Sequence, residues 1–199
     1  MSRFNTVLHG ALSALMIGAA VSVAAEGDMY KGYEVPPYRV VAQEGAIEIR
    51  EYGAHLVAEV TVAGDRSGAI SRGFQVLADF IFGNNADGAK VAMTSPVAQA
   101  PAGENWIVRF TMPSAFTAET LPAPANPAIR VVEAAPERQI VVSFTGRATE
   151  AELGRRIAQV RAEAEARGLD SSGEPRFYFY DGPFTLPWAR RNEVALPVS

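Results

Sequence analysis

The sequence predicts an α+β domain made of two copies of a strand-strand-helix-strand-strand unit, related by a pseudo-twofold axis. Two amphipathic helical segments share the same apolar spacing, and each has a pair of strand-like segments on either side. Between the two units, residues 113–127 contain several prolines, which disfavour regular structure and indicate an extended connector. The chain of 199 residues is 48% hydrophobic and 20% charged, which is sufficient for a single buried core.

Residues 1–25 have the features of a secretory signal peptide. Arg3 gives a positive start, residues 7–23 are mostly small and apolar, and Val23-Ala24-Ala25 fits a small-residue cleavage site. The alternative is an uncleaved membrane anchor, but the apolar stretch is short for a span of about 20 apolar residues. We therefore expect a mature chain of residues 26–199 that is periplasmic or secreted and is not stably inserted in a membrane.

The first unit contains expected strands at residues 46–51, 56–62, 90–97 and 106–112. The helix between its second and third strands has apolar residues at i, i+4, i+7 and i+11. These residues are Ile70, Phe74, Leu77 and Ile81. Asp65 is placed to cap the start of this helix, and Gly83 is placed to end it. A single apolar stripe indicates that the helix covers a sheet on one side only.

The strand expected at residues 56–62 shows the two faces of a half-buried strand. Alternation places Leu56, Ala58, Val60 and Val62 on one face and His55, Val57, Glu59 and Thr61 on the other. On this pattern His55 is most simply a solvated histidine at the edge of the strand.

The second unit repeats this order with expected strands at residues 129–133, 139–144, 176–180 and 193–196. The apolar residues of its helix are Leu153, Ile157, Val160 and Ala164, at the spacing found in the first helix. The segment Thr149-Glu150-Ala151-Glu152 predicts a capping box, in which the Thr hydroxyl and the Glu carboxylate satisfy each other's backbone donors. Gly168 is placed to end the helix.

The composition excludes several classes of function. A net charge of −4 disfavours a nucleic-acid surface, which needs a concentrated basic face. With no cysteine, the chain has no disulfide, thiolate metal site, cysteine nucleophile or covalently attached haem. It also has no nucleophile elbow, no metal-binding His pattern and, after cleavage, His55 alone among histidines. We therefore expect a binding protein, a monomer, rather than an enzyme.

A late loop carries large apolar side chains where burial is hard to arrange. Phe184, Leu186 and Trp188 lie among Gly182, Pro183 and Pro187, and Arg190 follows them. Lying over an amphipathic helix, such a loop forms a slot for a flat hydrophobic ligand whose carboxylates could meet the arginine. The alternative is a loop that is simply folded onto the core.

Several strings, in fixed order, resemble the SOUL/haem-binding protein family across roughly Tyr33 to Leu196. They are Ile47-Glu48-Ile49-Arg50-Glu51-Tyr52-Gly53, the run 73–83, Lys90-Val91-Ala92-Met93-Thr94-Ser95-Pro96-Val97, Trp106-Ile107-Val108, Phe110-Thr111-Met112-Pro113-Ser114, Glu119-Thr120-Leu121-Pro122 and Arg191-Asn192-Glu193-Val194. The resemblance implies a distorted β-barrel with two flanking helices. It also implies that the ligand is haem or another tetrapyrrole, bound non-covalently by a carrier or buffer.

On this resemblance, the slot lies between the first helix and the late loop. Its candidate lining residues are Ile70, Phe74, Leu77, Ala78, Ile81, Phe184, Leu186, Trp188 and Arg190. The strings themselves are interpreted mainly as fold determinants, since a proline ends a strand and a buried Asn or Glu usually satisfies backbone groups.

The sequence departs from the family where iron would be bound. Some relatives have a histidine where this chain has Glu51, and haem-binding relatives can offer a cation near the position of Asp79. The donors that remain for iron are His55, Tyr52 and Met93, and spacing favours none of them, so we expect the slot to hold the ligand without a strong His axial ligand.

A second interpretation is a module that binds bulky amphipathic cations, by analogy with the effector-binding domains of drug-responsive regulators. The acidic residues Glu51, Glu59 and Asp79 would suit such a cation better than they suit haem propionates.

Overall fold

The computed structural model describes residues 29–199, so the predicted signal peptide lies outside the described residues. The helices are α1 (Arg66–Ile81), α2 (Glu150–Ala166) and the short 3-10 helix η1 (Pro187–Ala189). The strands are β1 (Met29–Tyr30), β2 (Tyr33–Glu34), β3 (Tyr38–Glu44), β4 (Ile47–Tyr52), β5 (His55–Ala63), β6 (Val97–Ala102), β7 (Asn105–Thr111), β8 (Ile129–Ala134), β9 (Glu137–Thr145), β10 (Arg176–Phe179) and β11 (Arg191–Pro197).

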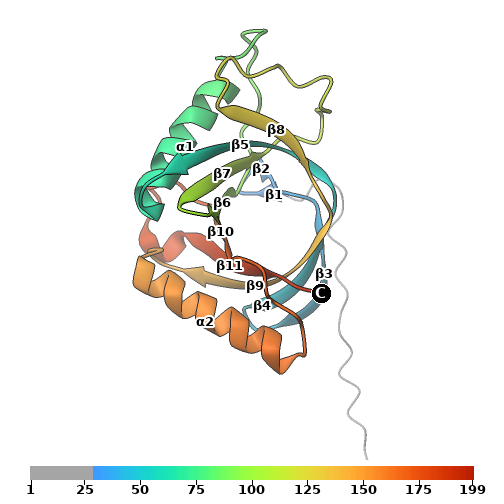
Figure 1. Cartoon of the computed structure of the whole chain (residues 1–199), viewed down its shortest axis with the longest axis vertical. Coiled ribbons are helices and arrows are strands. Elements are labelled where there is room, and N and C mark those ends of the chain that lie inside the picture. Colours follow the sequence, from blue (N-terminus) through green and yellow to red (C-terminus); the bar gives the residue numbers. More distant parts are fainter. Residues whose placement is uncertain (1–28) are drawn as a thin grey trace, which may run out of the picture.

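One antiparallel sheet of nine strands forms the body, in the order β3-β4-β9-β11-β10-β6-β7-β5-β8. It curls into the open half-barrel shown in Figure 1. The strands of the first unit, β4 to β7, correspond in order to those of the second, β8 to β11. When each strand is replaced by its counterpart, the sheet order from β4 to β8 becomes the same order read from the other end, as a twofold axis requires. The axis lies between β6 and β10. The predicted duplication and pseudo-twofold symmetry are therefore confirmed, and β3 is an addition to one edge.

The helices occupy equivalent places on the outer face of the sheet, α1 over β5 and β7 and α2 over β9 and β11. Asp65 accepts a hydrogen bond from the Gly68 amide at 2.8 Å, and Thr149 accepts one from the Glu152 amide at 3.2 Å. The reciprocal half of the predicted capping box does not form, because the Glu152 carboxylate pairs with Arg155 and Arg156 instead. Among residues 29–199, no helix is long and apolar enough to cross a bilayer.

The apolar stripe of α2 is confirmed, with Leu153, Val160 and Ala164 buried against the sheet. The stripe of α1 is rotated from the prediction. Gly73 is buried, and a Cβ there would lie 2.5 Å from Cγ2 of Val108, so α1 approaches β7 through its glycine. That approach turns Phe74 to the edge, where it is 38% exposed and packs against Phe110.

The prediction of a strand at residues 90–97 is wrong. Strand pairing begins at Val97, and the preceding residues form an irregular segment under α1. The Val91 amide donates to the Ile81 carbonyl at 2.8 Å, and its side chain fills the core below the helix. Pro96 has no amide hydrogen to offer a neighbouring strand.

Residues 29–37, which we call the N-terminal arm, cross the concave face of the sheet. Tyr30 packs edge-on against Tyr180 at 5.0 Å between ring centroids, and its hydroxyl donates to Asp181 at 2.8 Å. Val35 packs on the same cluster of concave side chains. The arm therefore covers the part of the concave face near β10 and β11 and does not pack on the part near β5 and β7.

Candidate ligand-binding site

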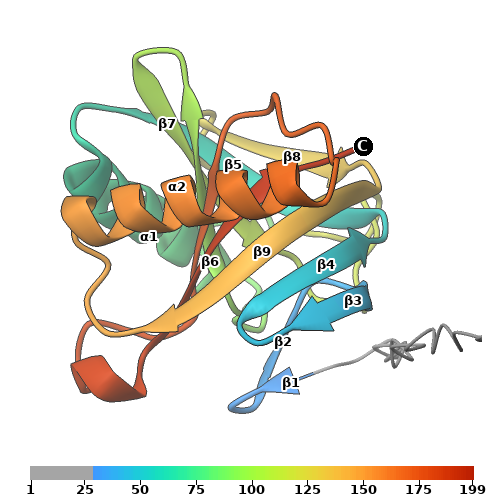
Figure 2. The ribbon, with the colours of Figure 1, turned by 90° about the horizontal axis from the view of Figure 1, so that it is seen from below.

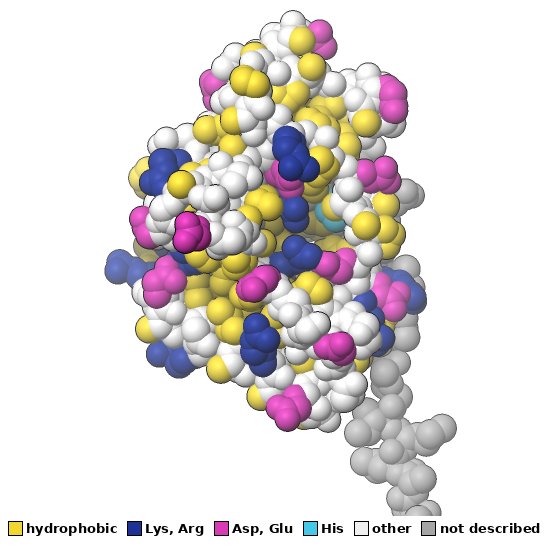
Figure 3. Space-filling model, viewed as in Figure 1, with side chains coloured by type: hydrophobic (Ala, Val, Ile, Leu, Met, Phe, Trp, Pro, Cys, Tyr) yellow, Lys and Arg dark blue, Asp and Glu magenta, His cyan; other side chains and the backbone are white. Residues whose placement is uncertain are grey.

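A cavity of about 340 Å³ lies in the concave face, which we call the concave cavity. Figure 3 looks onto this hollow, where hydrophobic side chains are bordered by basic side chains and by a histidine. Its lining comprises Pro36, Tyr52, His55, Val57, Pro96, Ala98, Gln99, Ala100, Ile107, Arg109, Thr111, Val132, Glu133, Ala134, Ala135, Pro136, Glu137, Gln139, Arg176 and Tyr178. These residues come from strands of both units, so the fold, not local sequence, assembles the cavity.

The apolar side chains of the cavity follow from strand alternation. Ala58 and Val60 pack beneath α1, which leaves Val57 on the opposite face, at the cavity. In the same way, Val108 of β7 faces α1 and Ile107 faces the cavity. The two faces predicted for β5 are confirmed.

His55 borders this cavity and is half-buried, which corrects its interpretation as a solvated edge histidine. The reason is topological, because β5 pairs with β7 on one side and β8 on the other and is not an edge strand. Nδ1 of His55 lies 2.8 Å from the Gly53 carbonyl, which can only accept, so the ring proton resides on Nδ1. Burial lowers the pKa of His55 below 6.5, more than the Gly53 contact raises it. The ring is therefore neutral at pH 7, with the lone pair of Nε2 available as a donor.

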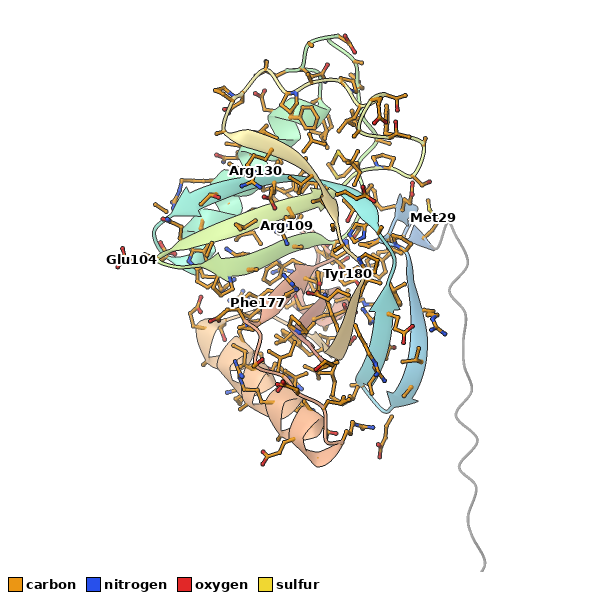
Figure 4. All side chains as sticks on the ribbon, turned by 45° about the vertical axis from the view of Figure 1, so that its right-hand side comes forward. Met29, Glu104, Arg109, Arg130, Phe177 and Tyr180 are labelled. Carbon is orange, nitrogen blue, oxygen red and sulfur yellow. The ribbon has the colours of Figure 1, made fainter. Side chains whose placement is uncertain are left out.

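Two arginines border the cavity, and each has an acidic partner. Nε of Arg109 lies 2.6 Å from the buried carboxylate of Glu59, which Arg130 approaches from the other side at 3.5 Å. Figure 4 shows Arg109 and Arg130 on the two strands that flank β5. Arg176 makes a bidentate pair with Glu137, at 2.9 Å and 2.5 Å. Burial opposes the charge of Arg176, but this pair outweighs it and raises the pKa of Arg176.

A buried ionic network adjoins the cavity beneath Tyr52. Arg50 and Glu193, both fully buried, form a bidentate pair at 2.8 Å and 2.9 Å. Arg50 also donates to the Tyr52 hydroxyl at 3.1 Å. Burial raises the pKa of Tyr52 well above 10.0, so its hydroxyl is protonated at neutral pH in the ligand-free protein.

Met93 packs with the core cluster beneath α1, on the opposite face of the sheet from the cavity. Of the three predicted iron donors, His55 and Tyr52 border the cavity; the Tyr52 hydroxyl already accepts from Arg50, whereas Nε2 of His55 keeps its lone pair.

The residues predicted to line a slot between α1 and the late loop differ in their burial. Leu77, Ala78 and Ile81 are buried, and their predicted role in lining the slot stays a prediction. Ile70 is half-buried, and Phe74 is at the edge of the helix. Phe184, Leu186 and Trp188 are exposed, and Arg190 is half-buried within its own loop. None of these predicted residues lines the concave cavity, and a ligand in the slot remains a prediction.

The residues of the strings are mainly fold determinants, as predicted. Asn192 donates to the Gly146 carbonyl at 3.0 Å, and Thr94 donates to the Thr111 carbonyl at 2.7 Å. Met112 is buried in the core below α1. Glu193 differs from the expectation, because its partners include two arginine side chains, Arg50 and Arg191, rather than backbone groups.

The half-barrel with two outer helices is an α+β fold whose inner face carries the concave cavity. Residues 33–197 match the family described as SOUL heme-binding protein, and the chain belongs to that family.

Solved structures share the fold at low sequence identity. The C-terminal domain of EcmrR has a TM-score of 0.60 at 13% identity, covering 77% of this chain and 96% of that one. A hydrolase from Listeria innocua has a TM-score of 0.56 at 14% identity, covering 80% and 94%. An uncharacterized conserved protein from Listeria innocua has a TM-score of 0.59 at 14% identity, covering 77% and 92%. No curated protein matches the sequence.

Proposed function

We propose that this protein binds haem or a related tetrapyrrole non-covalently in the concave cavity and serves as a carrier or buffer. The observation that carries the proposal is the apolar floor beside His55, whose Nδ1 proton is held by Gly53 so that Nε2 is free. Family membership independently points to this class of ligand.

The lining fits the separate parts of such a ligand. Val57, Ile107 and Val132 would contact the macrocycle. Arg109 and Arg176 would meet its carboxylates through the N–H groups that Glu59 and Glu137 do not use, the two Nη atoms of Arg109 and Nη1 of Arg176. His55 would supply one axial ligand to the iron, as a neutral imidazole oriented by a backbone carbonyl. When bound, haem supplies an iron centre that can exchange axial ligands.

The size of the cavity favours exchange over permanent retention. Its volume of about 340 Å³ is near the lower end of the range of about 300–1,000 Å³ for ligand pockets. A macrocycle held there would keep part of its surface in water, which suits a carrier or buffer.

The cation-binding alternative is less well supported, because its three acids are already neutralised or hydrogen-bonded. Glu59 pairs with Arg109 and Arg130, and Glu51 pairs with Arg39. Asp79 accepts a hydrogen bond from the Asn84 side chain. The likeness to EcmrR concerns the fold alone.

Titration with haemin, followed by the Soret band, tests the proposal. We expect Ile107→Glu to abolish binding, because it places a charge on the apolar floor, and His55→Ala to remove the spectrum of a ligated iron. Met93→Leu is the matched control at a rejected donor and should change nothing. Iron-free protoporphyrin should bind His55→Ala as well as it binds the parent, because it needs no axial ligand.

The predicted slot gives the opposite pattern. If Phe74→Asp or Trp188→Ala abolishes haemin binding while Ile107→Glu and His55→Ala leave it intact, the ligand lies under the late loop and our site is wrong. Thermal unfolding of each variant separates loss of binding from loss of fold. Binding of a bulky organic cation without any response to haemin would favour the alternative function.

A further inference from the structure

Residues 182–190, which we call the apolar loop, expose large hydrophobic side chains. Phe184 is 99% exposed, Trp188 is 73% exposed and Leu186 is 55% exposed. Isolated hydrophobic residues are common on protein surfaces, but three within five positions of one loop form a patch. The concave cavity and the core use none of the three.

Internal hydrogen bonds hold the apolar loop in this exposed shape. Arg190 donates from Nε to the Thr185 carbonyl at 2.7 Å and from Nη2 to the Pro183 carbonyl at 2.5 Å. The Gly146 amide donates to the Pro187 carbonyl at 3.0 Å and ties the loop to the end of β9. The side chains are thus presented by a braced loop, and little ordering entropy would be lost when they dock.

The position and charge of the apolar loop indicate the kind of surface that it meets. Figure 2 shows the segment around η1 projecting at a corner of the molecule, away from the sheet. Its nine residues include Arg190 and no acid. Lys31 of the N-terminal arm reaches the Ala189 carbonyl at 3.3 Å and pairs with Asp181, which neutralises the nearest carboxylate. Arg147, exposed beside Gly146, adds another cation.

We propose that the apolar loop docks on the interface of an anionic phospholipid bilayer, as a reversible peripheral contact. Phe, Leu and Trp are the side chains that enter the boundary between headgroups and acyl chains, and flanking cations attract anionic headgroups. A second copy of the chain is a poorer occupant, because a stable interface buries about 800 Å² on each partner and a projecting tip offers little area. This inference does not depend on the identity of the ligand in the concave cavity.

The chain contains two tryptophans, so Trp106→Phe leaves Trp188 as the sole reporter in the loop. We expect its emission to shift to the blue when vesicles of phosphatidylcholine with phosphatidylglycerol are added, and to be quenched by brominated lipids. Phosphatidylcholine alone should give a weaker response, and added salt should reduce the response to anionic vesicles.

Paired variants localise the contact. In the Trp106→Phe background, Phe184→Ser with Leu186→Ser should weaken vesicle binding by about tenfold or more, because both apolar side chains are lost. Phe82→Ser is the matched control, since Phe82 is 59% exposed beyond the end of α1, and it should leave vesicle binding unchanged. All variants share the same N-terminal residues, so a difference between them reports on the loop.

Three results would overturn the inference. Trp188 emission that ignores both kinds of vesicle excludes lipid contact. Equal loss in the loop variant and in Phe82→Ser means that the contact is not specific to the apolar loop. A sedimentation mass of a dimer that falls to the monomer mass in the loop variant assigns the patch to a second copy of the chain.

Discussion

Among single residues, Arg50 and Glu193 show how the family motifs specify the fold. Burial would raise the pKa of Glu193, but Arg50 and Arg191 outweigh it and hold that pKa below 4.5. Tyr180 and Ser143 donate further hydrogen bonds to the same carboxylate, at 3.0 Å and 3.1 Å. A buried ion pair of this kind contributes little net stability, yet removing one partner is costly because the other charge is left without compensation.

Glu193→Gln should therefore destabilise the protein by about 3 kcal/mol in urea unfolding, since Arg191 loses its partner and the buried Arg50 keeps only the partly exposed Glu48. The double variant Arg50→Met with Glu193→Leu should lose much less, because neither charge remains. If both variants lose the same amount, packing and not charge dominates at this position.

The same pair sets an acid limit on stability. Because the folded pKa of Glu193 is below its unfolded value of about 4.5, its contribution is fully present above that pH and is lost as the pH falls through the lowered folded value. The melting temperature of the double variant should therefore fall less steeply below pH 4.5 than that of the parent.

His55 gives a second pH dependence, in a different range. Its folded pKa is lowered below the unfolded value of 6.5, so the fold favours the neutral ring. Stability should be full above pH 6.5 and decline as the pH falls from 6.5 through the lowered folded pKa. His55→Gln should remove this decline in a series of thermal melts. A decline that persists in the variant would have another origin.

At the scale of elements, the two helices differ in how closely they approach the sheet. A Cβ at Gly73 of α1 would lie 2.5 Å from Val108, whereas a Cβ at Gly154 of α2 would meet nothing within 4 Å. The duplicated unit thus uses glycine for close packing in one helix and carries an exposed glycine in the other.

Gly73→Ala should cost about 1–3 kcal/mol, because the added methyl group forces α1 away from β7. Gly154→Ala should instead stabilise the protein by about 0.5–1 kcal/mol, through the higher helix propensity of alanine. Chemical unfolding of both variants checks this pair. A stabilising Gly73→Ala would show that the interface of α1 can relax.

Much of the fold could be predicted from the sequence, because periodicity and end signals are local. Asp65 and Thr149 cap the helices where expected. The buried face of α1 was harder to predict, because a rule that selects large apolar residues places Phe74 on that face and overlooks Gly73. The strand expected at 90–97 has the composition of a strand, but tertiary packing of Val91 overrides it.

The candidate site could be predicted only in fragments. Alternation in β5 placed Val57 and His55 on one face, but nothing local indicated that Ile107, Val132 and Arg176 would join them. A concave cavity depends on curvature and on pairing between strands distant in sequence, which residue patterns do not encode.

At the scale of the whole molecule, the pseudo-twofold symmetry is broken on the concave face. The half that contains β9, β10 and β11 carries the Arg50–Glu193 network and is covered by the N-terminal arm. The half that contains β5 and β7 gives the cavity its smaller apolar side chains, Val57 and Ile107, and the other half lines it with larger polar residues such as Tyr178 and Arg176. Pro36 of the arm borders this cavity, so the arm sets one of its limits.

We propose that the protein is exported and that residues 1–25 are removed. Cleavage before Glu26 would leave three residues ahead of Met29, so the arm would stay intact in the mature chain. Mass spectrometry of the native protein should give a mass for a chain that starts near Glu26. An intact mass that includes residues 1–25 would contradict export with cleavage.

The N-terminal arm ties together segments that are distant in sequence. Its Glu34 carbonyl accepts from the Ser95 amide at 2.9 Å, and the Glu34 side chain accepts from the Ser114 amide at 2.8 Å. A chain that starts at Tyr38 would lose these bonds and expose Tyr180, and it should be less stable by about 3 kcal/mol for the apolar contacts of Tyr30 and Val35.

A milder variant, Tyr30→Ala, keeps the arm but removes its anchor on Tyr180 and Asp181. It should weaken haemin binding less than the truncation does, because Pro36 still borders the cavity. Thermal melts and haemin titrations of the two variants measure both effects. If the truncated chain melts and binds like the parent, the arm neither closes the concave face nor limits the cavity.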